Sequence, residues 1–290
     1  MIKSKTSRAG DLLIVFLCVL LILACLLPLM NIVARSLSSA DALVRNQVGL
    51  LPVGLNFSAY EMVLGDSKYT TSMGWTAILT VICTVVSMVM TIMCAYPLTY
   101  SQLRGRKVFN ALIIFTMYFS AGAIPNYLLF KDLRLLDNPL VLILPNCISV
   151  FNMIIMRSFL YGIPESLRES TEIDGAGPIR VLISIYLPLS TPVLATLSLF
   201  YAVGRWNGYT DALIYMVNAR QYHPIQLLLY NILNSITSIE VATQEGFSTP
   251  GLSDTLKAAT VVFATVPILL IYPWLQKYFI AGVTLGAVKE

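Results

Sequence analysis

A short stretch within a long apolar run combines two charged groups, an amide and aromatic rings. Arg205, Asn207 and Asp211 can form hydrogen bonds, and Trp206 and Tyr209 present ring faces. Sugars bind well to such a surface, because their hydroxyls bond to amides and charges and their CH faces stack on rings. A charge at the centre of a bilayer costs about 2.5–3.5 kcal/mol on insertion scales, so these groups are expected to face a cavity or a partner. The five residues are therefore a candidate lining for a path through a membrane.

A purely structural role for this stretch is the alternative. Gly204 and Gly208 are spaced to let two helices pack closely. Arg205 and Asp211 are six positions apart, so they would not share a face of one continuous helix. A partner for Arg205 is therefore expected on another helix or another chain, and the residue types leave both roles open.

A second polar stretch, residues 161–188, separates two apolar runs and is longer than a simple connection requires. Pro164 suits the start of a helix and Gly175 suits its end. We therefore predict a helix over 164–174 and a second short helix over about 179–186.

One face of the first predicted helix favours docking of another surface. Leu167, Ser170 and Thr171 fall at i, i+3 and i+4, and small residues allow close approach. Acidic residues line the adjacent faces and follow the helix: Glu165, Glu169, Glu172 and Asp174. A docking element for a soluble partner and a plain solvated loop both remain open at this point.

The composition identifies the solvent in which these elements work. Of 290 residues, 57% are hydrophobic and 12% are charged, against roughly 45–50% and about 25% in soluble domains. Mean hydropathy is +0.76. Too few polar residues remain to cover a water-facing surface. A soluble enzyme, a disordered chain and a secreted disulfide scaffold are thereby excluded, and a membrane protein is predicted.

Catalytic and cofactor motifs are missing from the sequence. The single histidine, His223, excludes a site with several His ligands, and there is no GxxxxGK[ST] loop for nucleotide phosphates. A net charge of +4 gives no support for nucleic-acid binding. We expect a chain that catalyses no reaction and holds no metal or cofactor of its own.

Gaps between charged residues predict where the chain crosses the bilayer, since a spanning helix needs about 20 mostly apolar residues. Lys and Arg are more numerous on the side of the N-terminus, and Arg104, Arg106 and Lys107 share one short loop. Cytoplasmic loops carry this excess, so both termini are predicted to be cytoplasmic. The six predicted spans cover about residues 12–34, 73–97, 108–130, 138–159, 188–217 and 258–279.

The polar stretch carries a recognisable motif. Glu169-Ser170-Thr171 is followed by three residues, Gly175, nine residues and then Ile185-Tyr186-Leu187-Pro188. This pattern resembles the EAA motif of bacterial ABC importer permeases of the carbohydrate-uptake, maltose-transporter type. The spacing matches throughout, and Ser170 and Thr171 replace two alanines.

Two further segments extend the resemblance over most of the chain. Residues 200–215 resemble the fifth span of the LplC-like subgroup, which is linked to uptake of complex polysaccharides and oligosaccharides. Residues 278–289 are similar to the C-terminus of maltose-type permeases.

The resemblance implies a fold and a mechanism. It implies one all-α transmembrane permease domain over residues 1–290, a type I bundle of six helices with a cytoplasmic coupling helix in the segment 161–188. In this family the coupling helix sits in a cleft of a separate ATPase subunit, which binds ATP and Mg. Glu169 is then expected to pair with a basic group there. The coupling residues implied are Glu165, Glu169, Ser170, Thr171, Asp174, Gly175, Leu187 and Pro188.

The resemblance also implies the partners: a second homologous permease, two ATPase subunits, an extracytoplasmic solute-binding protein, a carbohydrate and the lipid of a bacterial cytoplasmic membrane. Outer segments 36–71 and 218–253 would contact the binding protein or the partner permease. Residues 226–236 of the second segment are apolar enough to lie at the membrane surface. Residues 282–290 would lie along the ATPase pair. The rival functions are a secondary transporter driven by an ion gradient and an ABC permease for a solute other than a sugar.

Overall fold

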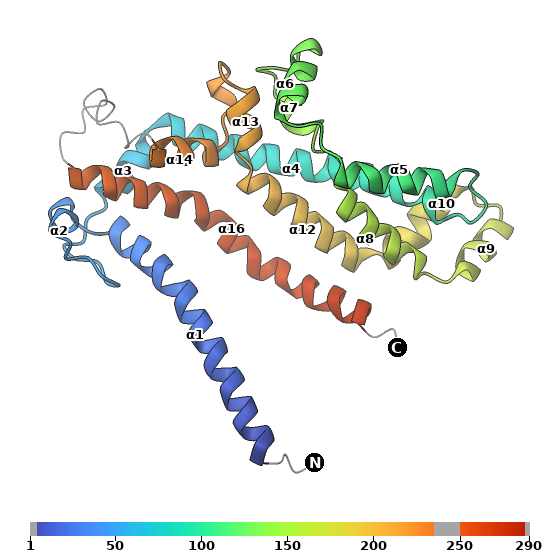
Figure 1. Ribbon diagram of the computed structural model, residues 1–290, viewed down its shortest axis with the longest axis horizontal. Helices are drawn as coiled ribbons and strands as arrows, with labels where there is room; N and C mark the ends of the chain where they lie inside the picture. The colour runs from blue at the N-terminus through green and yellow to red at the C-terminus, as the bar shows by residue number, and fades with distance from the viewer. Residues whose placement is uncertain (1–4, 235–249, 288–290) are drawn as a thin grey trace. The chain divides into compact units, whose positions relative to one another are not determined.

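The computed structural model describes residues 5–234 and 250–287, and in these ranges all regular structure is helical (Figure 1). The chain divides into two compact units. One unit comprises Met1–Thr70 and Leu229–Val266, and the other comprises Thr71–Leu228 and Pro267–Glu290. Two long helices, α4 (Ser67–Ala95) and α16 (Pro250–Ala287), pass from one unit into the other.

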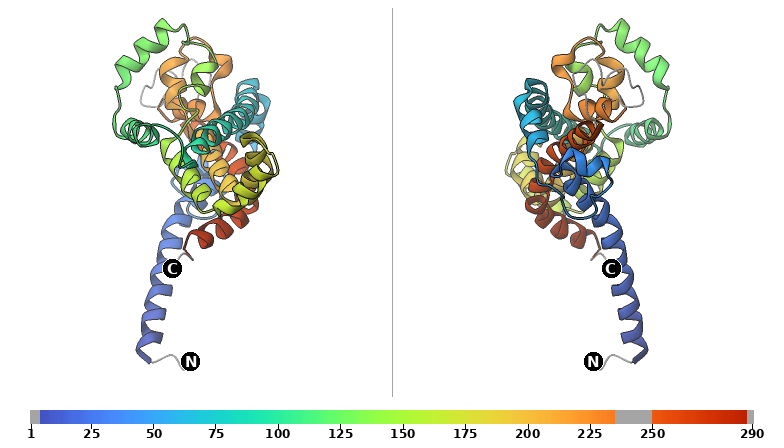
Figure 2. Two further views of the ribbon diagram at one scale, coloured as in Figure 1. Left: turned by 90° about the vertical axis from the view of Figure 1, so that its right-hand side faces the viewer. Right: turned by 90° about the vertical axis from the view of Figure 1, so that its left-hand side faces the viewer.

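The first unit contains a helix that is apolar on every side. The most apolar window within residues 10–36 of α1 (Lys5–Ser36) has no buried residue, and Figure 2 shows α1 as one continuous helix. A helix that is hydrophobic all round requires lipid or a protein partner around it. The unit's small core lies elsewhere, where Ala59 and Val63 of α3 (Ser58–Gly65) meet Leu256 and Ala259 of α16.

The second unit has its core where four segments meet. Buried side chains from α4, α8 (Val150–Tyr161), α10 (Pro178–Val181) and α12 (Thr191–Asn207) pack together there. The central members of this core include Ala95, Met156, Leu160, Val181 and Leu197.

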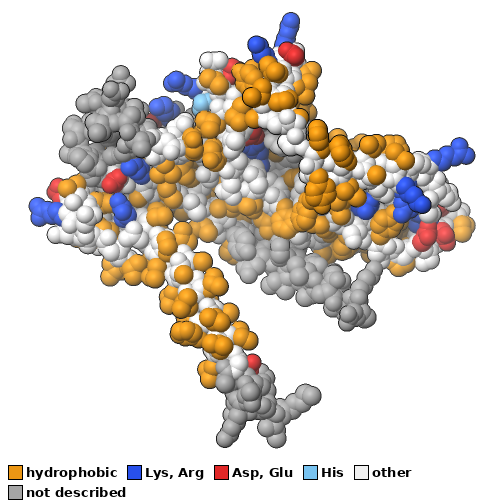
Figure 3. Space-filling view, viewed as in Figure 1, with side chains coloured by type: hydrophobic (Ala, Val, Ile, Leu, Met, Phe, Trp, Pro, Cys, Tyr) orange, Lys and Arg blue, Asp and Glu red, His pale blue; other side chains and the backbone are white. Residues whose placement is uncertain are grey.

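The third predicted span, 108–130, is a bent pair of helices in the structure. The chain forms α5 (Arg106–Tyr118) and α6 (Ala123–Asp132), which meet at 111°. Gly122 stands at the bend with φ of +93°, a conformation that side chains other than glycine rarely adopt. Neither helix contains a buried residue, and Figure 3 shows apolar side chains covering them.

The fourth predicted span, 138–159, is also interrupted. A single helical turn, α7 (Leu140–Ile143), is separated from α8 by a segment that contains Pro145. Proline has no N–H to donate and clashes with the preceding turn, which explains the interruption. The helix resumes at a cap, because the Ser149 hydroxyl accepts a hydrogen bond from the Asn152 N–H at 3.4 Å.

The fifth predicted span, 188–217, is wrong as a continuous helix. α12 ends at Asn207, Gly208 adopts an extended conformation with φ of −74° and ψ of 127°, and α13 (Thr210–Tyr215) follows. At its other end, α12 meets the segment Pro178–Leu189 at 84°.

By length and composition, three helices among the described residues could cross a membrane, or up to five if each bent pair counts as one span. The three are at residues 10–36, 67–99 and 254–271, where the first, second and sixth spans were predicted. α8, with 12 residues, is apolar but shorter than a spanning helix.

The outer segment 218–253 is described in part. Its apolar beginning forms α14 (Ile225–Asn234), close to the predicted 226–236, and residues 235–249 lie outside the described part of the chain. The start of α14 is tied to α4, since the Ile225 N–H donates to the Thr76 hydroxyl at 2.8 Å.

Asp137 ties the end of α6 to the turn after α13. Its N–H donates to the Tyr215 carbonyl at 2.9 Å, and its carboxylate accepts from the Asn218 side chain at 2.8 Å and backbone at 2.7 Å. These hydrogen bonds from Asn218 lower the pKa of Asp137, so the carboxylate stays charged and continues to accept them.

Candidate functional site

The predicted helix over 164–174 is present as α9 (Glu165–Ile173). Pro164 lies just before the helix rather than at its first position, because its ψ of 131° is extended. Figure 1 shows α9 and α10 next to each other, and α9 projects a largely polar surface.

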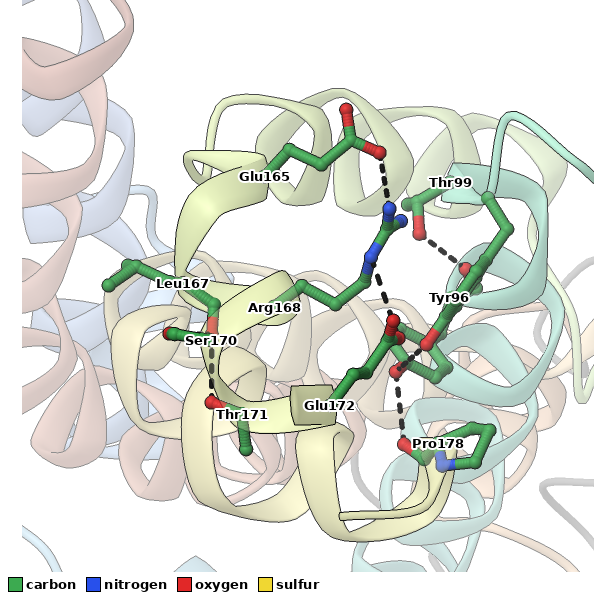
Figure 4. Close-up of polar contacts among 10 residues, drawn as sticks. Tyr96, Thr99, Glu165, Leu167, Arg168, Ser170, Thr171, Glu172 and Pro178 are labelled. Carbon is green, nitrogen blue, oxygen red and sulfur yellow. Dashed lines mark hydrogen bonds and ion pairs between the residues drawn. The ribbon is translucent and has the colours of Figure 1, made fainter. Parts of the chain in front are cut away.

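Arg168 anchors α9 to the rest of the unit, a role that its place in the sequence does not indicate. The residue is 8% exposed although it belongs to a short polar helix. Its guanidinium bonds to Glu165, lies 3.6 Å from a Glu172 oxygen and sits 4.7 Å from the centre of the Tyr100 ring (Figure 4). Two carboxylates and a ring face together offset the cost of burying the charge.

The anchor continues into the body of the unit through tyrosine hydroxyls. Tyr100 and Tyr96 share a hydrogen bond of 2.6 Å, and the Tyr96 hydroxyl donates to the Pro178 carbonyl at 3.0 Å. Burial alone would lower the pKa of Arg168, but the hydrogen bond that it donates to Glu165 and the charges of Glu165 and Glu172 outweigh burial and raise that pKa. Arg168 is therefore charged at any physiological pH.

These contacts divide the acidic residues of α9 into two groups. Glu165 and Glu172 contact Arg168, so both are engaged within the chain, and the coupling role of Glu165 stays a prediction. Glu169 is exposed and makes no ion pair with any described residue. Glu169 is thus the acidic side chain of α9 most available to a partner.

The opposite face of α9 is small and exposed. Leu167 is 40% exposed, and Figure 4 shows Leu167 and Ser170 pointing away from Arg168. The hydroxyls of Ser170 and Thr171 donate back to the Leu167 carbonyl at 3.2 and 2.8 Å. Because the hydroxyls are satisfied within the helix, these two residues present little more than the bulk of alanine.

Gly175 ends α9 in a Schellman motif. Its N–H donates to the Glu172 carbonyl at 3.0 Å, and the next N–H, of Ala176, donates to the Thr171 carbonyl at 3.1 Å. The motif requires the left-handed conformation, and φ of Gly175 is +83°. Asp174 is the capping residue before it and is exposed.

The end of the predicted coupling segment lies apart from the exposed face of α9. The second predicted helix, 179–186, is present as α10 followed by a π-helical turn, Leu182–Tyr186. Leu187 and Pro188 belong to the next short helix, α11 (Leu187–Leu189), at the junction with α12. Six of the eight predicted coupling residues therefore lie together on α9 and the turn that ends it, whereas Leu187 and Pro188 lie where α11 meets α12.

A cavity of about 1180 Å³ opens within the second unit. Segments from α4 to α13 line it, and four of the five predicted path residues take part: Arg205, Asn207, Tyr209 and Asp211. Trp206 does not line the cavity, because it is 7% exposed and packs into the protein. The structure therefore does not place Trp206 with the other four residues, and its assignment to the path stays a prediction.

Arg205 and Asp211 form an ion pair across the break between α12 and α13. Both terminal nitrogens of Arg205 bond to the Asp211 carboxylate, and the two side chains are 8% and 15% exposed. The six-residue spacing predicted that these two residues would not pair on one continuous helix. They pair here because the chain turns at Gly208 and Asp211 lies on the next helix. Arg205 also donates to the Leu142 carbonyl at 3.3 Å and to the Gly208 carbonyl at 3.1 Å.

Gly208 allows this turn by having no side chain. A β-carbon there would lie 3.1 Å from a terminal nitrogen of Arg205. Gly204 lies within α12 and Gly208 lies after its end, so the two glycines do not form the packing face on one helix that their spacing suggested.

Asparagines form a part of the cavity that sequence reasoning missed. Asn126, Asn146 and Asn152 line it together with Asn207. Only their placement by the fold identifies them, since each stands alone in an apolar run. No group of three or more His, Cys, Asp or Glu suited to a metal occurs among the described residues.

The comparison with family models decides the identity. Residues 84–285 match the family described as the inner membrane component of binding-protein-dependent transport systems. The chain belongs to this family. It is a permease subunit of an inner-membrane ABC transporter, and its role is transport rather than catalysis.

Individual relatives of this permease cover almost its whole length. The Bacillus subtilis permease YtcP of a polygalacturonan/rhamnogalacturonan transport system is 39% identical over 98% of this chain and 99% of its own. Protein LplC of the same organism is 40% identical over 91% and 89%. A crystal structure of a bacterial ABC transporter involved in import of the acidic polysaccharide alginate has a TM-score of 0.89 and 34% identity, covering 96% of this chain and 99% of that one.

We predict that Gly175→Ala destabilises the permease and Gly177→Ala does not. Both glycines have open space where a β-carbon would lie, but only Gly175 has positive φ. The left-handed conformation should cost alanine about 1 kcal/mol. Thermal unfolding of the two purified variants in the same detergent measures the difference, and equal midpoints would show that the Schellman turn contributes nothing.

We predict that Asp211→Asn and Arg205→Met each destabilise the permease by about 3 kcal/mol, because each leaves a partner of a buried pair uncompensated. The double variant Arg205→Met/Asp211→Leu should be more stable than either single variant. Thermal unfolding checks this, with the exposed Arg220→Ala as a control that should match the wild type. Additive losses in the double variant would argue against the pair.

Proposed function

We propose that this permease is one of two membrane subunits of an ATP-driven importer that carries an oligosaccharide or polysaccharide fragment into the cytoplasm. The names of its relatives support a sugar as the substrate. They are polygalacturonan and rhamnogalacturonan for YtcP, alginate for the related structure, and arabinooligosaccharides for a permease that is 25% identical over 90% of this chain. The cavity supports it too, since amides and aromatic rings are the groups that bind sugars.

The observation that carries the ATP-driven part is the mounting of α9. A helix that transmits force must be rigidly attached on one face and free on the other. Arg168 attaches the inner face, while Leu167, Glu169 and Ser170 remain exposed on the outer faces. This arrangement suits a helix that inserts into a cleft of an ATPase, with Glu169 pairing with a basic group there.

The other partners follow from the same assembly. A second homologous permease completes the path, two ATPases bind ATP and Mg, and a solute-binding protein delivers the sugar on the outer side. The outer segments 36–71 and 218–253 would face that protein, although residues 235–249 lie outside the described part. Residues 282–290 would reach the ATPases; no side chain of this tail is described.

The proposed orientation has both termini in the cytoplasm. Arg104 precedes α5, and Arg106 and Lys107 are its first two residues; α9 follows α8 on what the span order makes the same side. The coupling helix must be on the cytoplasmic side, where ATP is present. An importer for a solute other than a sugar would keep this coupling arrangement, so the substrate needs its own test.

We predict that Glu169→Lys abolishes sugar import. The change places a positive charge where the ATPase is expected to offer one, and the two charges repel. Import into proteoliposomes that contain the full importer, with ATP inside and binding protein outside, is the measurement. Asp132→Lys at the end of α6 makes the same charge change on another exposed acidic residue and should leave import intact. Import that persists in the Glu169 variant, or that proceeds without ATP, would contradict the proposal.

We predict that Arg168→Gln lowers the ATPase activity stimulated by the binding protein several-fold and spares the basal activity. The variant removes the charge that attaches α9 to the unit, so motion of the membrane helices and of the ATPases becomes less tightly linked. Arg168→Lys should recover only part of the loss, because lysine cannot bond to both carboxylates in the planar manner of arginine. Arg180→Gln changes an exposed arginine of α10 and serves as the control. Full stimulation in Arg168→Gln would show that the anchor is dispensable.

A further inference from the structure

Asn152 is the most unusual polar residue in the wall of the cavity. It is 5% exposed, and what remains exposed lines the cavity. Its backbone N–H is used to cap α8, but its side-chain amide has no hydrogen-bond partner among the described residues. Buried amides in proteins nearly always have a partner in the protein, in water or in a ligand. The amide of Asn152 is therefore available to a molecule that enters the cavity.

Arg205, by contrast, has no donor to offer. Its two terminal nitrogens carry four hydrogens, and these are matched by the Leu142 and Gly208 carbonyls and two Asp211 oxygens. The remaining N–H, on Nε, is buried and does not reach the cavity surface. Arg205 thus closes the break between α12 and α13 and does not bind what passes through the cavity.

The same pair leaves the described lining of the cavity without net charge. Arg205 is its one cation and Asp211 its one anion, and they neutralise each other. A carboxylate on a sugar would have to displace Asp211 to reach Arg205, and a buried carboxylate would then be left unpaired. The cavity therefore offers no favourable site for a charged group.

Uncharged groups remain for recognition. The amides of Asn126, Asn146 and Asn207 also have no partner among the residues that the structure describes, and all three line the cavity. The ring of Tyr201 is fixed in the wall, because its hydroxyl bonds to the Thr91 hydroxyl at 2.7 Å and accepts from the Ser149 N–H at 3.1 Å. A fixed ring face and several free amides match the CH faces and hydroxyls of a sugar.

We propose that Asn152 binds sugar hydroxyls in this cavity, and that the cavity of this subunit selects for hydroxyls and ring faces without regard to the charge of the sugar. This inference rests on the proposed function, since it assumes that the cavity lies on the path of an oligosaccharide. Selection for or against an acidic sugar then falls to the partner permease or the binding protein.

The test uses trigalacturonate and its fully methyl-esterified form, which differ in charge and share their ring hydroxyls. The complete importer is purified with its binding protein and trapped with vanadate, and the radiolabelled sugar retained by the complex is measured. Asn152→Ala should lower retention of both sugars about tenfold and equally, as expected for the loss of a hydrogen bond to a hydroxyl.

A second variant guards against a folding defect in the first. Asn152→Asp keeps the size of the side chain and adds a negative charge, so it should reduce retention of trigalacturonate more than that of the ester. Asn31→Ala, whose amide bonds to the Gly49 carbonyl outside the cavity, should retain both sugars as the wild type does.

Three outcomes would overturn either this inference or the proposed function. Unchanged retention in both Asn152 variants would show that Asn152 does not contact the sugar. A loss in Asn152→Ala confined to the charged sugar would show that the cavity does respond to charge. A wild-type importer that neither retains nor imports either sugar would instead contradict the proposed function, whatever the variants do.

Discussion

Satisfaction of backbone groups inside a membrane is the constraint on which this structure depends. Lipid offers no hydrogen bonds, so a helix can break within the bilayer only where other protein groups take over the exposed N–H and C=O groups. The second unit breaks its helices repeatedly, and side chains close the breaks. Arg205 bonds to the Leu142 and Gly208 carbonyls, and Ser149 caps the start of α8. The broken helices in turn create the cavity, so the polar closures and the cavity have one physical origin.

The same principle operates outside the membrane in α9, with a different purpose. A nine-residue helix of polar sequence is too short to be stable on its own. Arg168 makes it part of the folded unit through Glu165, Glu172 and the Tyr100 ring. The Schellman turn at Gly175 then fixes the direction in which the chain returns to the core. The outer faces are thereby left free without loss of rigidity, which is the property required of a coupling element.

The sequence predicted best what local signals determine. The bounds of α9 were correct to within one residue, because Pro164 and Gly175 mark the ends of a helix by their own backbone preferences. The three long apolar spans were located for the same reason. The breaks at Gly122 and Gly208 were not predicted, since glycine is also common within membrane helices and does not by itself mark a turn. Trp206 stands between Arg205 and Asn207 in the sequence, but its side chain packs into the protein and does not line the cavity.

Residues defined by their surroundings were the hardest to predict. Asn152 is one polar residue in an apolar run, and nothing in its sequence neighbours distinguishes it from a helix cap or a packing contact. For Arg168, Glu165 and Glu172 are neighbours in the sequence, but only the fold places the ring of Tyr100 against its guanidinium.

The geometry at Gly208 carries a consequence for how such chains diverge. A β-carbon at position 208 would lie 3.1 Å from a terminal nitrogen of Arg205, and the turn at 208 is what brings Asp211 within reach. A larger residue at 208 would therefore have to displace the guanidinium, and loss of the arginine removes the need for the carboxylate. Positions 205, 208 and 211 should accordingly covary during evolution, so that related chains keep all three residues or replace all three.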